Sequence, residues 1–337
     1  MKYTPYEITS FNANYGAEVP ARIDEILEAI KASKDDALIL ISNLNLTPDE
    51  SRMLNKEVDT LNQGNRSVSL KLLDHHGSGQ VSADKYEWYY LDTARCATKI
   101  VYEYAKEHFE LEDSSWLAKF VDVVNAVDLW HQNEVENFEY GKVCMRLVTE
   151  TRELSRVLFS NQDRHYKLTL LEQAAMMVNE PNAPVVLDEK IHKMKKEYFR
   201  VDEDNTLDNL ATAFIVKLFG EKRKDMSFYY KGYKGFLSYG IGNTSIIGNG
   251  FLTKYDDEFD FIVDISPRGT MSLRANNKVD VSIIANEWAK GGGHPNASGG
   301  RIQGFKEQFR YSLVKKQIQS LIDRCESVAG KLEFKPE

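Results

Sequence analysis

Short apolar runs that alternate with helical segments are the feature that most constrains the fold of the first half of this chain. Residues 37–43, ALILISN, form an apolar run of strand length, and residues 67–73, SVSLKLL, form a second. Between them, Thr47, Pro48 and Glu50 have the spacing of a capping box, which predicts the start of a helix. Further helices are predicted over residues 22–33, 93–107 and 115–127. Strands that alternate with helices indicate a parallel sheet covered by helices, so we expect an α/β fold.

The second half of the chain carries a separate set of strand and helix patterns after about residue 205. Strands are predicted over residues 226–230, 235–240, 259–265 and 270–275, and helices over 243–254, from Asp280 onward and over 305–328. Residues 150–200 are helical and charged, with a helix break near 180–187. We therefore expect two α/β domains, over residues 1–180 and 206–330, joined by a helical linker over 181–205.

Composition and charge exclude several classes of function. The formal net charge of −8 leaves no basic footprint for duplex DNA, so the expected ligand is small. The three cysteines, Cys96, Cys144 and Cys325, follow no metal-ligand or disulfide spacing, which is typical of a reducing compartment. No run approaches the roughly 18 apolar residues of a membrane span, and the start has no signal-peptide stretch. We expect a cytoplasmic protein without a membrane partner.

Asp74, His75 and His76 follow the second predicted strand and form the first candidate site. Neutral imidazole is a good ligand for Mn, Zn and Fe, and a neighbouring carboxylate fixes its tautomer. Ligands of parallel sheets bind beyond the carboxyl ends of the strands, and Asn43 also falls at such an end. A turn at Gly77 would let the three side chains converge. The alternative is a polar strand end that only meets water.

The segment GGGHPNASGG, residues 291–300, is the second candidate and predicts an anion site. Glycines let backbone N–H groups approach a ligand closely, and His294 can donate a hydrogen bond to a phosphate oxygen. Asn296 and Ser298 add further donors. The alternative is a C-cap for the helix that is predicted to end at Lys290. A cap needs one glycine, whereas this segment contains five, so we favour the anion site.

Two charged residues complete the set of candidates. Arg274 lies on a predicted strand beside Ser272, and arginine binds phosphate through two parallel hydrogen bonds. Asp128 ends an apolar helix, where a carboxylate opposes the helix dipole and is stabilised by a cation such as a metal ion. The alternatives are an ordinary surface arginine and an aspartate that caps the following turn.

Together these motifs resemble the DHH phosphoesterase superfamily, most closely its bacterial and phage oligoribonuclease (nanoRNase) branch. The resemblance extends from about residue 7 to residue 305. It rests on Asp74-His75-His76 after a strand, on the Ser-Leu-Arg strand at 272–274 and on the GGGH segment. It implies a parallel-sheet DHH domain, a smaller α/β DHH-associated domain and a substrate cleft between them.

The resemblance also implies a mechanism and a set of roles. Members of the superfamily are hydrolases that cleave phosphodiesters with two Mn ions. By motif, His75 and Asp128 would be metal ligands, Asp74 would orient His75, and His76 would face the substrate phosphate. Substrate would be held by Arg274, Ser272, Gly292, Gly293, His294 and Asn296. The implied partners are short RNA, a dinucleotide or a cyclic nucleotide, with a homodimer as a possible assembly.

The sequence departs from the family pattern at the first two metal motifs. Family members begin with a strand that ends in His-x-Asp-x-Asp, whereas the first 34 residues here contain no His and a single Asp, Asp24. Asn43 stands where the family has its next aspartate, and a neutral amide would be a weak metal ligand. His75 and Asp128 alone would hold a divalent cation weakly.

Three interpretations of this ligand loss stay open. An upstream segment is missing from the sequence, or the chain holds one metal ion with help from Asn43 and substrate, or it no longer cleaves the nucleotide that it binds. Descent predicts a metal-dependent phosphodiesterase of the 3′–5′ oligoribonuclease type that acts on short oligonucleotides or dinucleotides. The main alternative is a catalytically inactive member that sequesters a (cyclic) nucleotide, and a structural adaptor is a third hypothesis.

Overall fold

The computed structural model describes residues 7–332 except 34, 65 and 113. The chain forms two compact units, and each contains two separate stretches of sequence. Unit 1 comprises Met1–Arg146 and Gln173–Asp188, and unit 2 comprises Leu147–Glu172 and Glu189–Glu337. Among the described residues, no helix is both long and apolar enough to cross a membrane.

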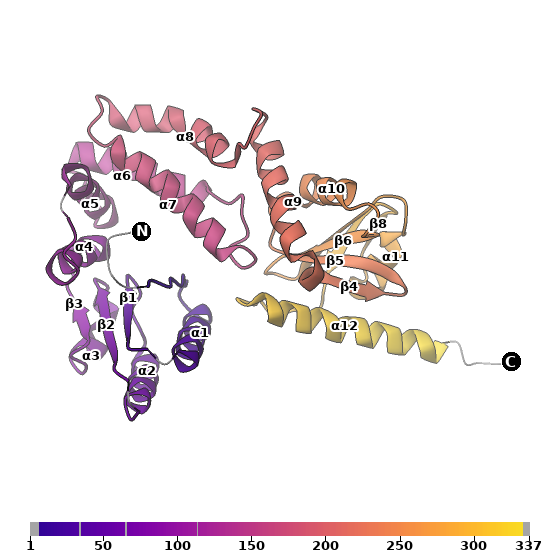
Figure 1. Cartoon of the computed structure of the whole chain (residues 1–337), viewed down its shortest axis with the longest axis horizontal. Helices are drawn as coiled ribbons and strands as arrows, with labels where there is room; N and C mark the ends of the chain where they lie inside the picture. The colour runs from indigo at the N-terminus through magenta and orange to yellow at the C-terminus, as the bar shows by residue number, and fades with distance from the viewer. Residues whose placement is uncertain (1–6, 34, 65, 113, 333–337) are drawn as a thin grey trace. The chain divides into compact units, whose positions relative to one another are not determined.

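Unit 1 is built on a parallel sheet of three strands in the order β1-β2-β3 (Figure 1). The strands are β1 (Ala37–Ser42), β2 (Val68–Asp74) and β3 (Tyr89–Leu91). Its helices are α1 (Glu18–Ala32), α2 (Pro48–Leu61), a 3₁₀ turn η1 (Gly77–Gly79), α3 (Gln80–Ala83), α4 (Ala97–His108) and α5 (Ser115–Asp128). The predicted α/β fold and parallel sheet are confirmed. The sequence prediction omitted β3, because three residues are too short for a strand pattern to stand out.

The helices of unit 1 form where the sequence supplies both start signals and an apolar face. At α2, Thr47 accepts a hydrogen bond from the Glu50 N–H, and the Glu50 carboxylate accepts one from the Thr47 N–H, so the predicted capping box is confirmed. The buried faces of α1 and α2 pack with β1 and β2 in one hydrophobic core, which includes Ile23, Leu54 and Leu72. This core fixes the sheet whose carboxyl edge carries the candidate site.

Three long helices each belong partly to unit 1 and partly to unit 2. They are α6 (Val135–Glu150), α7 (Ser160–Met176) and α8 (Ala183–Phe199). The predicted linker over residues 181–205 thus consists mostly of α8. The predicted domain boundaries near residues 180 and 205 stay predictions.

Unit 2 is built on a six-stranded mixed sheet in the order β4-β5-β6-β7-β9-β8 (Figure 1). The strands are β4 (Ser227–Tyr230), β5 (Tyr233–Tyr239), β6 (Phe261–Ile265), β7 (Thr270–Ala275), β8 (Gly292–His294) and β9 (Ala297–Arg301). The helices are α9 (Leu207–Met226), α10 (Thr244–Lys254), α11 (Val281–Ala289) and α12 (Tyr311–Leu332). Strands β5 and β6 run parallel, whereas the other neighbouring strands run antiparallel. A cluster of buried aromatic rings between α9, α10 and the sheet, including Phe219, Phe236 and Phe251, forms the core.

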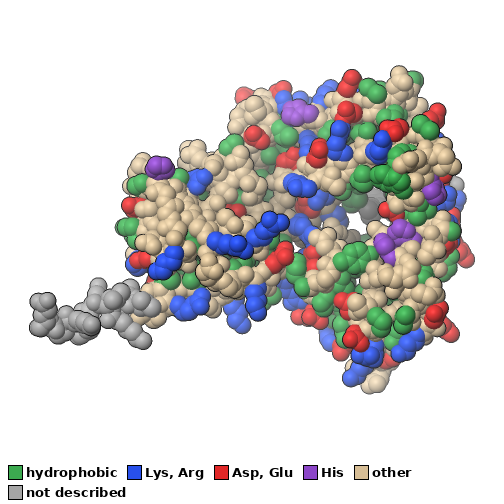
Figure 2. Space-filling model, turned by 180° about the vertical axis from the view of Figure 1, so that it is seen from behind, with side chains coloured by type: hydrophobic (Ala, Val, Ile, Leu, Met, Phe, Trp, Pro, Cys, Tyr) green, Lys and Arg blue, Asp and Glu red, His purple; other side chains and the backbone are tan. Residues whose placement is uncertain are grey.

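Surface charge is mixed in sign. On the face shown in Figure 2, Lys and Arg side chains are interspersed with Asp and Glu.

Candidate functional site at the carboxyl edge of the unit 1 sheet

The three parallel strands of unit 1 end side by side in polar residues. The backbone N–H of Asn43, directly after β1, donates to the Leu73 carbonyl at 3.1 Å. The N–H of Asp92, directly after β3, donates to the Asp74 carbonyl at 3.0 Å. Asn43, Asp74 and Asp92 therefore occupy neighbouring positions at the edge where parallel sheets bind ligands.

Asp74 is fully buried and its carboxylate is held on both oxygens. The Tyr89 hydroxyl donates to Oδ2 at 3.1 Å, and Nδ1 of His76 lies 2.7 Å from Oδ1. The resemblance implied that Asp74 orients His75, and the structure corrects this role, because the carboxylate contacts His76. Residues two apart on an extended strand share a side of the sheet, which explains why Asp74 meets His76.

Two tyrosines surround this pair. The Tyr15 hydroxyl lies 3.3 Å from His76 Nδ1, and the Tyr15 and His76 rings meet edge to face with centroids 5.9 Å apart. Burial, reinforced by the Asp74 charge, raises the pKa of Tyr89 and that of Tyr15 above the usual value, so both hydroxyls keep their protons. Tyr89 is therefore a hydrogen-bond donor to Asp74. Neither tyrosine was among the candidates from the sequence.

His75 meets Asp128 at the end of α5. Its Nε2 lies 3.3 Å from Oδ2 of Asp128, and the two side chains are 11% and 41% exposed. Two atoms at this separation can both bind one cation at the usual distances of about 2.0–2.2 Å. The pair thus fits a single divalent ion whose remaining ligands would be water or substrate.

The described residues do not fit a two-metal centre. They contain no group of three or more His, Cys, Asp or Glu side chains arranged for a metal ion. Both oxygens of Asp74 are committed to His76 and Tyr89, and Asn43 is exposed but neutral. Asp92 at the same edge is paired with Arg95, so Asp128 alone cannot offset the four positive charges that two divalent ions bring.

Gly79 leaves the space that the Tyr89 side chain needs to reach Asp74. A Cβ on Gly79, in the turn after the Asp-His-His motif, would lie 2.0 Å from the Tyr89 hydroxyl oxygen. Every other residue type would displace Tyr89 from Asp74. The turn that the sequence predicted at this point therefore exists, and its second glycine makes room for the tyrosine.

In unit 2, four of the predicted substrate residues, Arg274, Ser272, His294 and Gly292, lie on one face of the sheet, whereas Gly293 lies on the other face and Asn296 in the turn between β8 and β9. Arg274 on β7 pairs with Ala297 on β9, which pairs with His294 on β8. In the neighbouring row, Ser272 pairs with Gly299, which pairs with Gly292. Paired residues share a face, and strands lie about 4.8 Å apart, so Arg274 and His294 flank a span of about 10 Å.

The segment 291–300 contains β8 and β9, which pair as a β-hairpin. Four of its glycines face the chain itself: a Cβ on Gly291, Gly293, Gly299 or Gly300 would lie 2.1–2.8 Å from neighbouring atoms. A Cβ on Gly292 would meet nothing within 4 Å. Lys290, with φ 50°, is the left-handed cap of α11, so the glycines are not needed for capping. Close packing thus explains four glycines and leaves Gly292 open to a ligand.

Two predicted phosphate donors have other partners. The Asn296 side chain exchanges hydrogen bonds with Asn277, accepting from its backbone N–H at 2.8 Å and donating to its side-chain oxygen at 2.6 Å. The Ser298 hydroxyl donates to the His294 carbonyl at 2.7 Å. Arg274 donates to the Ser245 hydroxyl at 2.6 Å, at the start of α10. Asn296 and Ser298 therefore shape the hairpin, and phosphate binding by Arg274 and the exposed His294 stays a prediction.

No family model matches the chain. A curated protein of Helicobacter pylori named 3′,5′-cyclic-nucleotide phosphodiesterase is 44% identical over 323 residues, which cover 94% of this chain and 92% of that protein. The chain belongs to the family of this phosphodiesterase. A crystal structure of an uncharacterized protein from Helicobacter pylori G27 has 43% identity and a TM-score of 0.89, covering 96% of this chain and 94% of that chain. The pGpG-specific phosphodiesterase PggH of Vibrio cholerae has 10% identity and a TM-score of 0.23, which is too low to support any inference.

Membership of a phosphodiesterase family was predicted from the Asp-His-His and GGGH motifs and is confirmed at that level. Placement in the nanoRNase branch stays a prediction. Sequence reasoning missed Asp92, although it has the same signal as Asp74, an acidic residue directly after an apolar run. It also missed Tyr15 and Tyr89, for which the sequence offered no signal.

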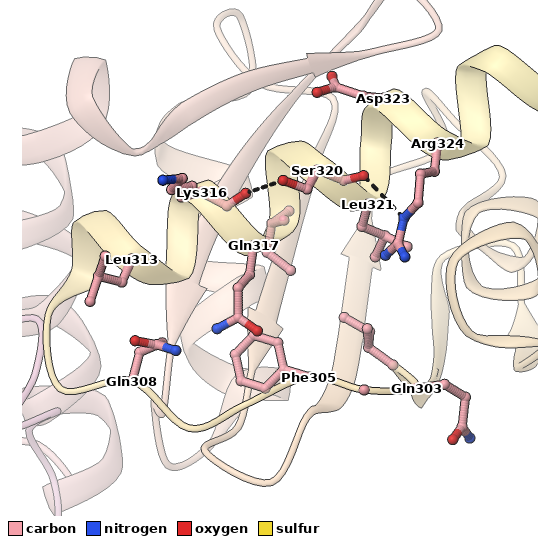
Figure 3. Close-up of a pocket in the computed structure, with 13 residues that line it drawn as sticks. Gln303, Phe305, Gln308, Leu313, Lys316, Gln317, Ser320, Leu321, Asp323 and Arg324 are labelled. Atoms are coloured by element: carbon pink, nitrogen blue, oxygen red, sulfur yellow. Dashed lines mark hydrogen bonds between the residues drawn. The ribbon is translucent and has the colours of Figure 1, made fainter. Parts of the chain in front are cut away.

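A cavity in unit 2 is lined by none of the candidate site residues. It has a volume of about 550 Å³ and lies between α12 and residues 302–308, with Phe305, Leu321 and Arg324 in its wall (Figure 3). The Gln317 amide ties the two walls together through hydrogen bonds of 3.0 and 2.8 Å with the Lys306 backbone. None of the residues predicted to bind metal or substrate in this phosphodiesterase family member lines it.

Proposed function

We propose that this chain is a metal-dependent phosphodiesterase of small nucleotides, with 3′,5′-cyclic mononucleotides as its first candidate substrates. The observation that carries the proposal is the 44% identity, over 94% of the chain, to a protein with that named activity. The pairing of His75 with Asp128 at the sheet edge gives the proposal a chemical centre. Short RNA and dinucleotides, which the DHH resemblance implies, are the second substrate class.

His75 and Asp128 are the residues that would hold the metal ion. When bound there, a divalent cation such as Mn²⁺ supplies Lewis-acid stabilisation of a phosphate oxygen. Asp128 contributes the only carboxylate of the pair, and its exposed fraction of 41% leaves room for substrate beside it.

His76 is the proposed proton-transfer group. Its Nδ1 faces the buried Asp74 carboxylate at 2.7 Å, which places the ring proton on Nδ1 and leaves Nε2 to face substrate. In that tautomer Nε2 can accept a proton from an attacking water molecule and later donate one to a leaving oxygen. Asp74 and Tyr89 act through His76 as positioning residues.

Arg274 and His294 in unit 2 are the proposed phosphate-binding residues. They lie at the two ends of one row of the sheet, the open position Gly292 lies on β8 two residues before His294, and a guanidinium and an imidazole are both suited to a phosphodiester oxygen.

Hydrolysis of cyclic AMP in the presence of Mn²⁺ tests the proposal. His75→Ala should lower kcat/KM about 100-fold or more, because loss of a metal-site residue removes both affinity and charge stabilisation. The matched control is His108→Ala, since His108 is an exposed histidine of the same unit that stacks on Tyr104 at the end of α4. Equal activity of the His75→Ala and control proteins would exclude the metal role.

The second candidate is a binding protein that retains nucleotide without cleaving it. The observation that favours it is the number of candidate metal ligands. The described residues bring together only His75 and Asp128, whereas a two-metal hydrolase needs more ligands than two. Equilibrium dialysis with cyclic AMP, followed by product analysis, separates the two. Binding that is lost in Arg274→Ala, with no turnover at any Mn²⁺ concentration, would establish the binding role.

A further inference from the structure

Tyr15 differs from Tyr89, the other tyrosine of the candidate site, in its exposure. Tyr89 is 4% exposed, and its hydroxyl donates to the buried Asp74 carboxylate. Tyr15 is 54% exposed, although its hydroxyl lies 3.3 Å from Nδ1 of His76. The hydroxyl of Tyr15 therefore reaches into the hydrogen-bond network while much of the side chain faces solvent. A side chain that is more than half exposed contributes little to a hydrophobic core.

The segment that carries Tyr15 is held in place just before α1. The Asn14 N–H donates to Oε2 of Glu18 at 3.0 Å, and Nε of Arg22 donates to the Asn12 carbonyl at 2.9 Å. Glu18 is 1% exposed and pairs with Arg22 at 3.2 Å, so these contacts belong to the buried start of the helix. The backbone next to Tyr15 is thus fixed by contacts that do not involve its ring.

The hydroxyl fixes the Tyr15 ring at its other end. Burial raises the pKa of Tyr15, and a hydrogen bond from the Asn45 backbone opposes this rise, so Asn45 and His76 both hold the hydroxyl. The rings of Tyr15 and His76 meet edge to face, a contact that occupies at most one face of the tyrosine ring. An aromatic ring that is already held at both ends loses little conformational freedom when a ligand stacks on it.

The position of Tyr15 suits the base of a nucleotide whose phosphate lies at the two histidines. The ring centroids of Tyr15 and His76 are 5.9 Å apart, and those of His76 and His75 are 4.3 Å apart, so the three rings follow one another along the site. In a 3′,5′-cyclic nucleotide a single ribose separates the phosphate from the base. A phosphate held at His75 and His76 therefore brings the base close to Tyr15.

We propose that the exposed ring of Tyr15 is the platform on which the nucleobase of the substrate stacks. The inference rests on the proposed function, because it requires the nucleotide phosphate to bind at His75 and His76. Every nucleobase can stack on an aromatic side chain through its face, and purines have a larger face than pyrimidines. Tyr15 then makes the site prefer nucleotides to phosphodiesters that lack a base, and purine nucleotides to pyrimidine nucleotides.

Equilibrium dialysis of the full chain, without added metal so that the ligands stay intact, tests the platform. It compares cyclic AMP with methyl riboside 3′,5′-cyclic phosphate, which has the same phosphodiester but no base. The unmodified protein should bind cyclic AMP about tenfold more tightly than this analogue, and Tyr15→Leu should remove most of that preference. Tyr15→Phe, which keeps the ring and lacks the hydroxyl, should retain it.

The matched control is Tyr90→Leu. Tyr90 on β3 is a second exposed tyrosine of the same unit, and its hydroxyl is likewise anchored, by a hydrogen bond of 2.8 Å from Arg95. The control protein should keep the preference for cyclic AMP. Circular dichroism verifies that the variants are folded, and cyclic CMP in place of cyclic AMP should show a smaller preference over the analogue.

The results separate this proposal from the proposed function. Failure of the unmodified protein to bind cyclic AMP, equal affinities for cyclic AMP and the analogue, or an unchanged preference in Tyr15→Leu would overturn the platform. A loss in Tyr15→Phe as large as that in Tyr15→Leu would also overturn it, since the hydroxyl and its contact with His76 would then be responsible. A protein that shows the predicted preferences but does not hydrolyse cyclic AMP with Mn²⁺ contradicts the proposed hydrolysis and still supports the platform.

Discussion

At the scale of single residues, Asn43 is the position with the clearest chemical consequence. It lies at the carboxyl end of β1, next to the strand that carries Asp74, and its φ of 55° is left-handed. Asn and Asp are the residues other than glycine that adopt this conformation most readily. An aspartate can therefore replace Asn43 without backbone strain.

Asn43→Asp should increase the affinity for Mn²⁺ about tenfold or more, because a carboxylate adds both charge and a hard oxygen ligand beside His75 and Asp128. Isothermal titration with Mn²⁺ measures the change. Asn182→Asp is a matched control, since Asn182 is an exposed asparagine of the same unit with the same φ of 55°. Two tight Mn²⁺ sites in the unmodified protein would contradict the single-ion interpretation.

The site residues illustrate what the sequence could and could not predict. Asp74, His75 and Asp128 were predictable because strand ends and helix ends can be located from local patterns. The exchange of partners, Asp74 with His76 and His75 with Asp128, depends on the direction of each side chain at the sheet edge. Tyr15 reaches the site from 61 residues away, a contact that no local pattern encodes.

At the scale of secondary structure elements, the glycines of the β8–β9 hairpin differ in what surrounds them. Gly293 has φ 146°, and a Cβ there would lie 2.6 Å from the Ala297 carbonyl oxygen, whereas Gly292 faces open space. The sequence revealed the glycines but not the hairpin, because strand pairing is decided by the neighbouring strand β7 and by the packing of α11.

Paired alanine substitutions test whether close packing and the proposed nucleotide binding depend on different glycines. Gly293→Ala should destabilise the protein by about 1–3 kcal/mol, because it combines an unfavourable φ with a backbone clash. Gly292→Ala should leave stability nearly unchanged and weaken nucleotide binding. Thermal denaturation and equilibrium dialysis measure the two effects. A Gly292→Ala protein with normal nucleotide affinity would show that the open position is not part of the binding site.

At the scale of the whole molecule, stability should depend on pH through one buried carboxyl group. Asp264 on β6 is 5% exposed, and burial raises its pKa to about 7 despite hydrogen bonds from Ser238 and Ile241. The folded protein then binds this proton more tightly than the unfolded chain. The stabilisation is complete below about pH 4 and is lost as the pH rises through 7.

Asp264→Asn should therefore flatten the dependence of the free energy of unfolding on pH between 4 and 8. The raised pKa corresponds to a loss of roughly 4 kcal/mol in the unmodified protein across this range. Urea denaturation at several pH values measures it, with Asp257→Asn, an exposed aspartate of the same unit, as the control. If the free energy of unfolding of the Asp264→Asn protein still falls with pH as steeply as in the unmodified protein, this carboxyl group does not cause the pH dependence.

The two compact units interleave along the chain, and this has an evolutionary consequence. Residues 147–172 belong to unit 2, whereas residues 173–188 return to unit 1, so no single cut in the gene yields both units whole. Recombination that exchanges one unit would need several coordinated breakpoints. We therefore expect the units to be inherited together, as in the Helicobacter pylori relative that matches 94% of this chain.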